Sequence, residues 1–94
     1  LVQLRAGRSM IDLVDTSHPA VDGGAVAAGG ARNVDHFCLI VDPFDETTLR
    51  AHLQDHGVTV GKTASRYGAE GAGPSFYIED PDGNTVELKG PLGR

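Results

Sequence analysis

Apolar and polar residues alternate most clearly near the C-terminus, in the segment FYIEDPDGNTVELKGP at 76–91. Such alternation is typical of half-buried strands, and it places Phe76 and Ile78 on one face of the first strand. The strand is followed by the turn-forming letters PDGN, in which we expect the Asp82 and Asn84 side chains to bond to the backbone. The segment therefore predicts a β-hairpin with one apolar face and one polar face.

Glu87 lies on the polar face of the second strand, between Val86 and Leu88, which share the apolar face. Taken alone, the hairpin is compatible with an ordinary, solvent-facing glutamate. The same polar face carries Ser75, Tyr77, Thr85 and Lys89. Whether Glu87 has a chemical role therefore depends on the rest of the chain.

Upstream, the segment VDHFCLIV at 34–41 is apolar on both faces and rich in β-branched residues, which predicts a central strand. A helix is expected next, because Asp45 is a favourable N-cap and Leu49 and Leu53 form an apolar stripe. Gly57 is the expected C-terminal stop. A strand followed by a helix thus precedes the C-terminal strands.

The remaining segments are shorter or rich in glycine. Residues 2–5 and 9–15 predict a first hairpin, and 16–33 predict a connector. Residues 58–67 favour one or two short strands, and GAEGAGP at 68–74 is expected to be a flexible loop. From the apolar strand onward the order is strand, helix and three strands, which indicates the α+β class.

Composition narrows the function classes. The chain has 94 residues, a net charge of −5 and scattered basic residues, which argues against a nucleic-acid-binding surface. No apolar run approaches the roughly 18 residues of a membrane span. A single cysteine, Cys38, excludes a disulfide within the chain and fits a reducing, cytoplasmic location. Because Leu1 starts within an expected strand, we expect a preceding N-terminal segment.

Three side chains of metal-ligand type occur in the middle of predicted strands. His36 lies in the apolar strand, Asp12 separates Met10 from Val14 on one strand face, and Glu87 lies in the last strand. A core histidine held by a hydrogen bond is the alternative for His36. If all three converge on one sheet face, an imidazole and carboxylates suit a divalent metal with open positions.

Other metal-ligand candidates in the chain are weaker. His52 and His56 are four residues apart on the predicted helix but have no evident third ligand, so we interpret them as solvent-edge residues. Cys38 shares a strand face with His36 and can line a pocket, although a small apolar core residue is the simpler interpretation. These residues therefore add nothing to the predicted metal site.

The segments NVDHFCLIV, PFDETTLRAHL and GPSFYIEDPDGNTVELKGP resemble the second βαβββ module of the vicinal oxygen chelate superfamily. This superfamily includes glyoxalase I, bleomycin-resistance proteins and extradiol dioxygenases. The resemblance implies a βαβββ module at 34–91, a connector at 16–33 and a remnant of the preceding module at 1–15. Its strands are expected to form part of an open, cup-shaped barrel.

By resemblance, His36 and Glu87 match metal ligands, and Asp12 occupies a third ligand position. The metal is expected to be Zn, Ni, Mn or Fe, and Glu87 is also the expected catalytic proton carrier. Arg66, Tyr67 and Tyr77 are the candidate substrate contacts. A further ligand position is absent from this chain, so either the preceding segment supplies it or a second copy completes the cup. We therefore expect a homodimer, which includes a strand-swapped form.

The resemblance implies a metal-dependent small-molecule enzyme of the glyoxalase or dioxygenase type, or a related lyase, isomerase or thiol transferase. Such an enzyme chelates two adjacent oxygens of its substrate and stabilises an enolate-like intermediate. The alternative is a metal-free drug-binding protein of the bleomycin-resistance type. The presence of His36 and Glu87 favours the enzyme. A third possibility is a fragment that folds without activity.

Overall fold

In the computed structural model, residues 1–15 and 33–91 are described, and they belong to two units, Leu1–Asp35 and His36–Arg94. The connector predicted at 16–33 lies outside the described residues, apart from Asn33. Each unit is therefore considered by itself.

The first unit contains the expected hairpin, with strands β1 (Val2–Ala6) and β2 (Ser9–Leu13) paired antiparallel. Gly7 in the turn has a φ of +62°, a backbone conformation that favours glycine. Because a lone two-stranded hairpin is at best marginally stable in water, its apolar side chains need a packing partner. The large apolar side chains exposed here are Leu1, Val2, Leu4, Ile11, Leu13 and Val14.

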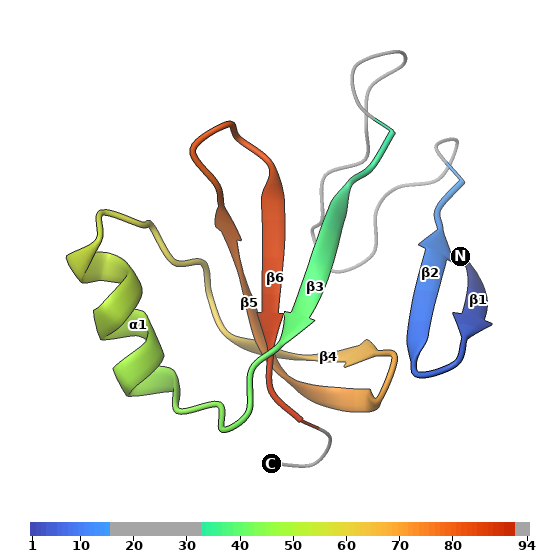
Figure 1. Cartoon of the computed structure of the whole chain (residues 1–94), viewed down its shortest axis with the longest axis horizontal. Coiled ribbons are helices and arrows are strands. Elements are labelled where there is room, and N and C mark those ends of the chain that lie inside the picture. The colour runs from blue at the N-terminus through green and yellow to red at the C-terminus, as the bar shows by residue number, and fades with distance from the viewer. Residues whose placement is uncertain (16–32, 92–94) are drawn as a thin grey trace. The chain divides into compact units, whose positions relative to one another are not determined.

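The second unit contains a four-stranded sheet and one helix (Figure 1). In chain order these are β3 (His36–Ile40), α1 (Glu46–Asp55), β4 (Ala64–Gly68), β5 (Gly71–Glu79) and β6 (Thr85–Lys89). The strand order is β3-β6-β5-β4, with β3 parallel to β6 and the other pairs antiparallel. The predicted α+β class and the strand–helix–three-strand order are confirmed.

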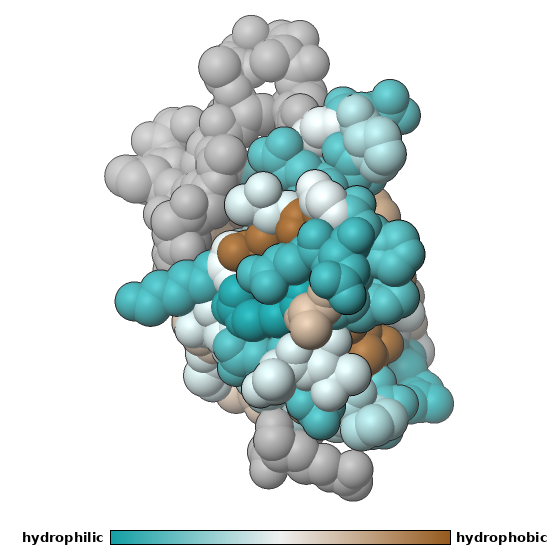
Figure 2. Space-filling view, turned by 90° about the vertical axis from the view of Figure 1, so that its left-hand side faces the viewer, coloured by the Kyte–Doolittle hydropathy of each residue, from teal (hydrophilic) through white to brown (hydrophobic). Residues whose placement is uncertain are grey.

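The hydrophobic core is made by the apolar face of the C-terminal hairpin, as its alternation predicts. Phe76, Val86 and Leu88 are buried, and Phe76 has no exposed surface. Full burial of such a side chain contributes about 1.5–3 kcal/mol. The partly buried side chains packed against them are Val41, Phe44, Leu49, Leu53, Val60 and Ile78. From the side of α1 the surface is mainly hydrophilic (Figure 2), which is typical of an amphipathic helix with its apolar stripe turned inward.

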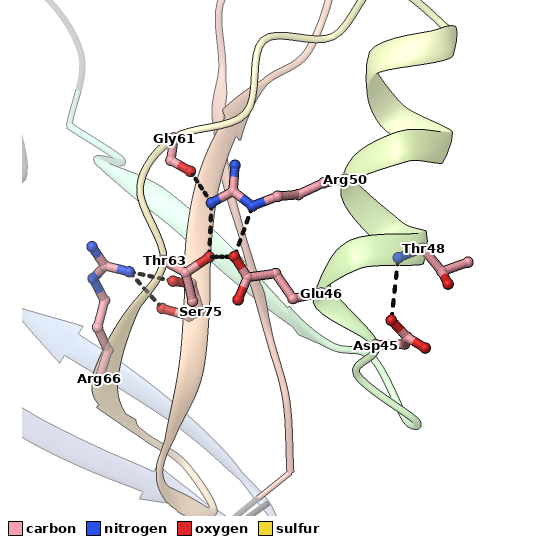
Figure 3. Close-up of polar contacts among 8 residues, drawn as sticks. All are labelled: Asp45, Glu46, Thr48, Arg50, Gly61, Thr63, Arg66 and Ser75. Carbon is pink, nitrogen blue, oxygen red and sulfur yellow. Dashed lines mark hydrogen bonds and ion pairs between the residues drawn. The ribbon is translucent and has the colours of Figure 1, made fainter.

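Helix α1 begins where the sequence predicts. The Asp45 side chain accepts a hydrogen bond from the Thr48 backbone amide at 3.2 Å. Arg50 links the helix to the segment before β4. Its guanidinium donates hydrogen bonds to the Gly61 carbonyl at 2.7 Å and to Thr63 Oγ1 at 2.8 Å (Figure 3). These bonds fix how α1 lies over the core.

The prediction that 34–41 forms a central strand is wrong. Within the four-stranded sheet, β3 is an edge strand that pairs only with β6. Phe37 and Leu39 are 50% and 51% exposed. The apolar pattern of a strand indicates which of its faces are buried. It does not indicate which strands pair with it, so it cannot distinguish a central strand from an edge strand.

The flexible loop predicted at 68–74 is also wrong, because these residues belong largely to β4 and β5. Gly68 pairs with Gly71 across a tight hairpin, and the pairing continues to Ser75. Gly73 is buried, and a Cβ built there would lie 2.9 Å from the Gly90 carbonyl oxygen. Glycine is thus required at this position by close packing, and it is part of a paired strand.

The turn between β5 and β6 differs in one detail from the expected one. The Asp80 carboxylate accepts hydrogen bonds from the backbone amides of Asp82 and Asn84, at 2.9 and 2.8 Å. The Asn84 side chain donates to the same carboxylate at 2.9 Å. Gly83 has a φ of +82°. Asp80, which precedes the predicted turn residues, is therefore the main side-chain acceptor.

Candidate metal and ligand site

Two of the predicted metal ligands lie together on adjacent parallel strands. His36 begins β3 and Glu87 is in the middle of β6, and the His36 Nε2 and Glu87 Oε1 atoms are 3.1 Å apart. Glu87 is only 6% exposed. Its second oxygen, Oε2, is buried and has no hydrogen-bond partner within the described part of the chain. The pair thus presents a buried acceptor beside an imidazole.

Glu87 is held in its ionised form. Burial raises its pKa, but the hydrogen bond from His36, the Ser75 hydroxyl and the nearby charges of His36 and Arg66 outweigh burial and lower the pKa. Because an ionised carboxylate only accepts hydrogen bonds, His36 Nε2 is the donor in the contact with Oε1. If a metal ion replaced this proton, its two ligand atoms, His36 Nε2 and Glu87 Oε1, would already be adjacent.

Two of the predicted substrate contacts border this pair. Tyr77 lies opposite Glu87 in the β5–β6 register, and its ring meets the His36 ring edge-on with centroids 5.1 Å apart. The Arg66 guanidinium lies 4.7 Å from the Tyr77 ring centroid. Arg66 also donates to the Ser75 carbonyl at 2.6 Å and to Ser75 Oγ at 2.9 Å (Figure 3). These contacts hold the aromatic ring beside the imidazole.

Cys38 lies next to Glu87 in the β3–β6 register. It is an exposed residue and so does not belong to the core. Partial burial of the thiol, followed by the negative charge of Glu87, raises its pKa to about 12. The thiol is therefore protonated near neutral pH, and Cys38 is a poor candidate for a nucleophile.

The other predicted site residues are placed differently. Asp12 lies in β2, in the first unit, so its part in a metal site remains a prediction. Tyr67 is 62% exposed and directly follows Arg66 along β4, so the two side chains point to opposite faces. Within residues 1–15 and 33–91, no group of three or more His, Cys, Asp or Glu side chains is arranged to hold a metal ion.

Sequence reasoning assigned no role to Lys89, which is 1% exposed and lies two residues beyond Glu87 on the same face of β6. The available signal was its position: the alternation that places Glu87 on the polar face places Lys89 there too. Lysine is almost never fully buried unless its charge has a partner, so the burial of Lys89 needs an explanation.

Several comparisons with known proteins relate this geometry to a family. Residues 2–88 match the model of the Glyoxalase/Bleomycin resistance protein/Dioxygenase superfamily. No curated protein gave a significant match. None of the helices in the described ranges is long and apolar enough to cross a membrane.

Similar solved structures include integron cassette protein VCH_CASS1 from the mobile metagenome of V. cholerae, which is 32% identical with a TM-score of 0.54. The V. pseudocholerae protein VPC_CASS1 is 31% identical with a TM-score of 0.54, and each match covers 94% of this chain and 66% of the other. Virulence protein STM3117 from Salmonella typhimurium is 25% identical with a TM-score of 0.55, over 79% of this chain and 54% of that one.

This chain therefore spans between about half and two thirds of the length of these structures. The family match, in contrast, extends over nearly the whole chain and includes both strands that carry the His36–Glu87 pair. The chain belongs to the Glyoxalase/Bleomycin resistance protein/Dioxygenase superfamily.

Proposed function

We propose that this protein is a metal-dependent small-molecule enzyme of the glyoxalase or dioxygenase type, in which His36 and Glu87 hold a divalent metal ion. The observation that best supports this proposal is the buried Glu87 Oε2, which has no partner within the described residues. Buried polar atoms are normally satisfied, and a cation shared with the adjacent imidazole satisfies this one. One imidazole and one carboxylate suit Zn, Ni, Mn or Fe.

The bound ion would supply Lewis-acid chemistry toward two adjacent oxygens of a substrate. Glu87 is ionised near neutral pH, since its pKa is lowered, and the carboxylate oxygen that does not bind the ion can accept a substrate proton. Tyr77 forms an aromatic wall beside the two ligands, held in place by Arg66. These three side chains would bind and orient a small molecule.

His36 and Glu87 alone are too few ligands for a tightly held ion. We propose that Asp12 or a second copy of the chain completes the set, in a homodimer or a strand-swapped form of it. The edge strand β3 supports this proposal, because its Phe37 and Leu39 side chains are about half exposed. An apolar edge strand is a ready site for pairing with another chain.

The test is metal-dependent stabilisation of the purified protein. Zinc, nickel or manganese at about one hundred times its Kd should add about 2.7 kcal/mol to the free energy of unfolding. His36→Ala and Glu87→Gln should each abolish this gain, whereas His52→Ala, which removes an exposed helical histidine, should retain it. Sedimentation of the same samples gives the number of chains in the metal-bound species.

If none of the metals changes the unfolding free energy, the enzyme proposal is wrong. The metal-free drug-binding function then becomes the better candidate for this chain. Equal metal stabilisation in wild type, His36→Ala and Glu87→Gln would instead show that the ion binds elsewhere.

A further inference from the structure

Lys89 combines nearly complete burial with very little hydrogen bonding. The residue is 1% exposed, and among the described residues its ammonium has one hydrogen-bond contact, with the Gly90 carbonyl oxygen at the outer limit of 3.5 Å. An ammonium has three donors, and burying a charge without strong partners costs several kcal/mol. The site therefore leaves donor capacity for a group that is not part of this chain.

The space around the lysine is built by glycines. A Cβ added to Gly68 would lie 3.1 Å from Lys89 Cε, and one added to Gly73 would lie 3.2 Å from Lys89 Nζ. These contacts are tighter than ordinary packing, so side chains at either position would push the lysine away. The hairpin of β4 and β5 thus forms a slot that fits the lysine stem and places its charge.

Glu87, the acidic residue on the same face of β6, makes no ion pair with Lys89. Glu87 points to the same face, two residues back along β6, but its Oε1 is paired with His36 and its Oε2 has no partner within the described ranges. A buried cation and a buried, half-paired carboxylate therefore lie along one strand face. A metal ion would satisfy the Glu87 carboxylate, and an anionic group of a ligand bound to that ion would satisfy the Lys89 ammonium.

We propose that Lys89 is a specificity-determining residue that binds the carboxylate of a small organic acid whose two adjacent oxygens are held at His36 and Glu87. This inference rests on the proposed metal site and adds the substrate class to it. Residues i and i+2 on a strand are about 6–7 Å apart, so the carboxylate should lie a few bonds from the oxygen pair.

Lys89 contributes a single positive charge, which one carboxylate balances. Arg66 is already committed to Ser75 and to the Tyr77 ring. The four-carbon stem allows the ammonium to move toward an entering ligand while remaining in its slot.

The test uses two probes with the same pair of adjacent oxygens: 3,4-dihydroxybenzoate and the neutral 3,4-dihydroxybenzamide. Titration calorimetry of the zinc-loaded full chain should show the carboxylate binding roughly ten- to a hundredfold more tightly than the amide. Lys89→Met should remove the preference for the acid, whereas Lys62→Met, at the only other lysine, which is exposed, should keep it.

A measurement on the unmodified sequence does not depend on a variant folding. Protein labelled at lysine 13Cε gives two resonances, from Lys62 and Lys89. The Lys89 resonance should shift with the benzoate and not with the benzamide, and the Lys62 resonance should not move. An unmoved Lys89 resonance, or a wild-type protein without preference for the acid, overturns the proposal.

The two proposals fail in different ways. The same titrations are repeated on zinc-free protein. Zinc stabilisation together with no Lys89-dependent preference for the acid overturns only the role of Lys89. A preference that depends on Lys89, in a protein that zinc does not stabilise, overturns the metal site and leaves Lys89 as the anion-binding residue.

Discussion

Replacing His36 with alanine should cost the protein about 2 kcal/mol of unfolding free energy at pH 5.5. A hydrogen bond to a charged group contributes about 1.5–3 kcal/mol, and an edge-on aromatic pair about 0.5–1.5 kcal/mol. His36 makes both, with Glu87 at 3.1 Å and with Tyr77 at a centroid distance of 5.1 Å. Its side chain is 28% exposed, so we take values near the lower ends of both ranges.

The pH dependence isolates the hydrogen bond from the ring contact. A carboxylate whose folded pKa is depressed contributes stability above its unfolded pKa, here 4.5, and this stability is lost as pH falls through the folded value. In His36→Ala the hydrogen bond that lowers the pKa of Glu87 is gone, while burial still raises it. The difference in unfolding free energy between wild type and variant should therefore shrink below pH 4.5.

Urea unfolding followed by the circular dichroism of α1 at pH 5.5 and 3.5 measures both quantities. His36→Phe keeps a ring beside Tyr77 but has no donor, so its destabilisation should also shrink on acidification. His52→Ala controls for the loss of a histidine that does not touch Glu87. A destabilisation by His36→Ala below about 0.5 kcal/mol, or one that stays constant between the two pH values, would refute the reasoning.

Two further predictions concern neighbouring features. Arg50→Met removes the hydrogen bonds of the guanidinium to the Gly61 carbonyl, Thr63 Oγ1 and Glu46 (Figure 3), and should lower the unfolding free energy by about 1–2 kcal/mol. Lys62→Met should change it by less than about 0.5 kcal/mol, and equal effects of the two variants in urea would contradict this prediction. Cys38 has a pKa of about 12, so its thiol should react slowly with iodoacetamide at pH 8.5. Glu87→Gln removes a negative charge beside the thiol and should speed the reaction severalfold. An unchanged reaction rate in this variant would contradict the prediction.

Much of the local structure could be predicted because it follows from nearest neighbours along the chain. The alternation around Phe76 and Val86 identified the buried face of the hairpin, and Asp45 identified the start of α1. Each of these signals acts within a few residues, through side-chain alternation or a capping bond. The resemblance also predicted that His36 and Glu87 belong to one site, and their side chains lie 3.1 Å apart.

Other features could not be predicted because they depend on which strands become neighbours. Glycine at position 73 looks like a sign of flexibility in the sequence, yet it is required because the Gly90 carbonyl lies close to it. The exposed apolar side chains of β3 look like those of a central strand until the strand order is known. Contacts of this kind depend on backbone segments far apart in the chain.

By itself, the sequence determined the faces of the strands, the limits of the helix and the presence of one imidazole and one carboxylate of ligand type. Only the tertiary structure decided that these two groups meet, and that Lys89 is buried on the same strand face. The physical reason is that hydrophobic patterning fixes the direction of a side chain relative to its own strand. The burial and the neighbours of Glu87 and Lys89 come from the parallel pairing of β3 with β6 and from the β4–β5 hairpin.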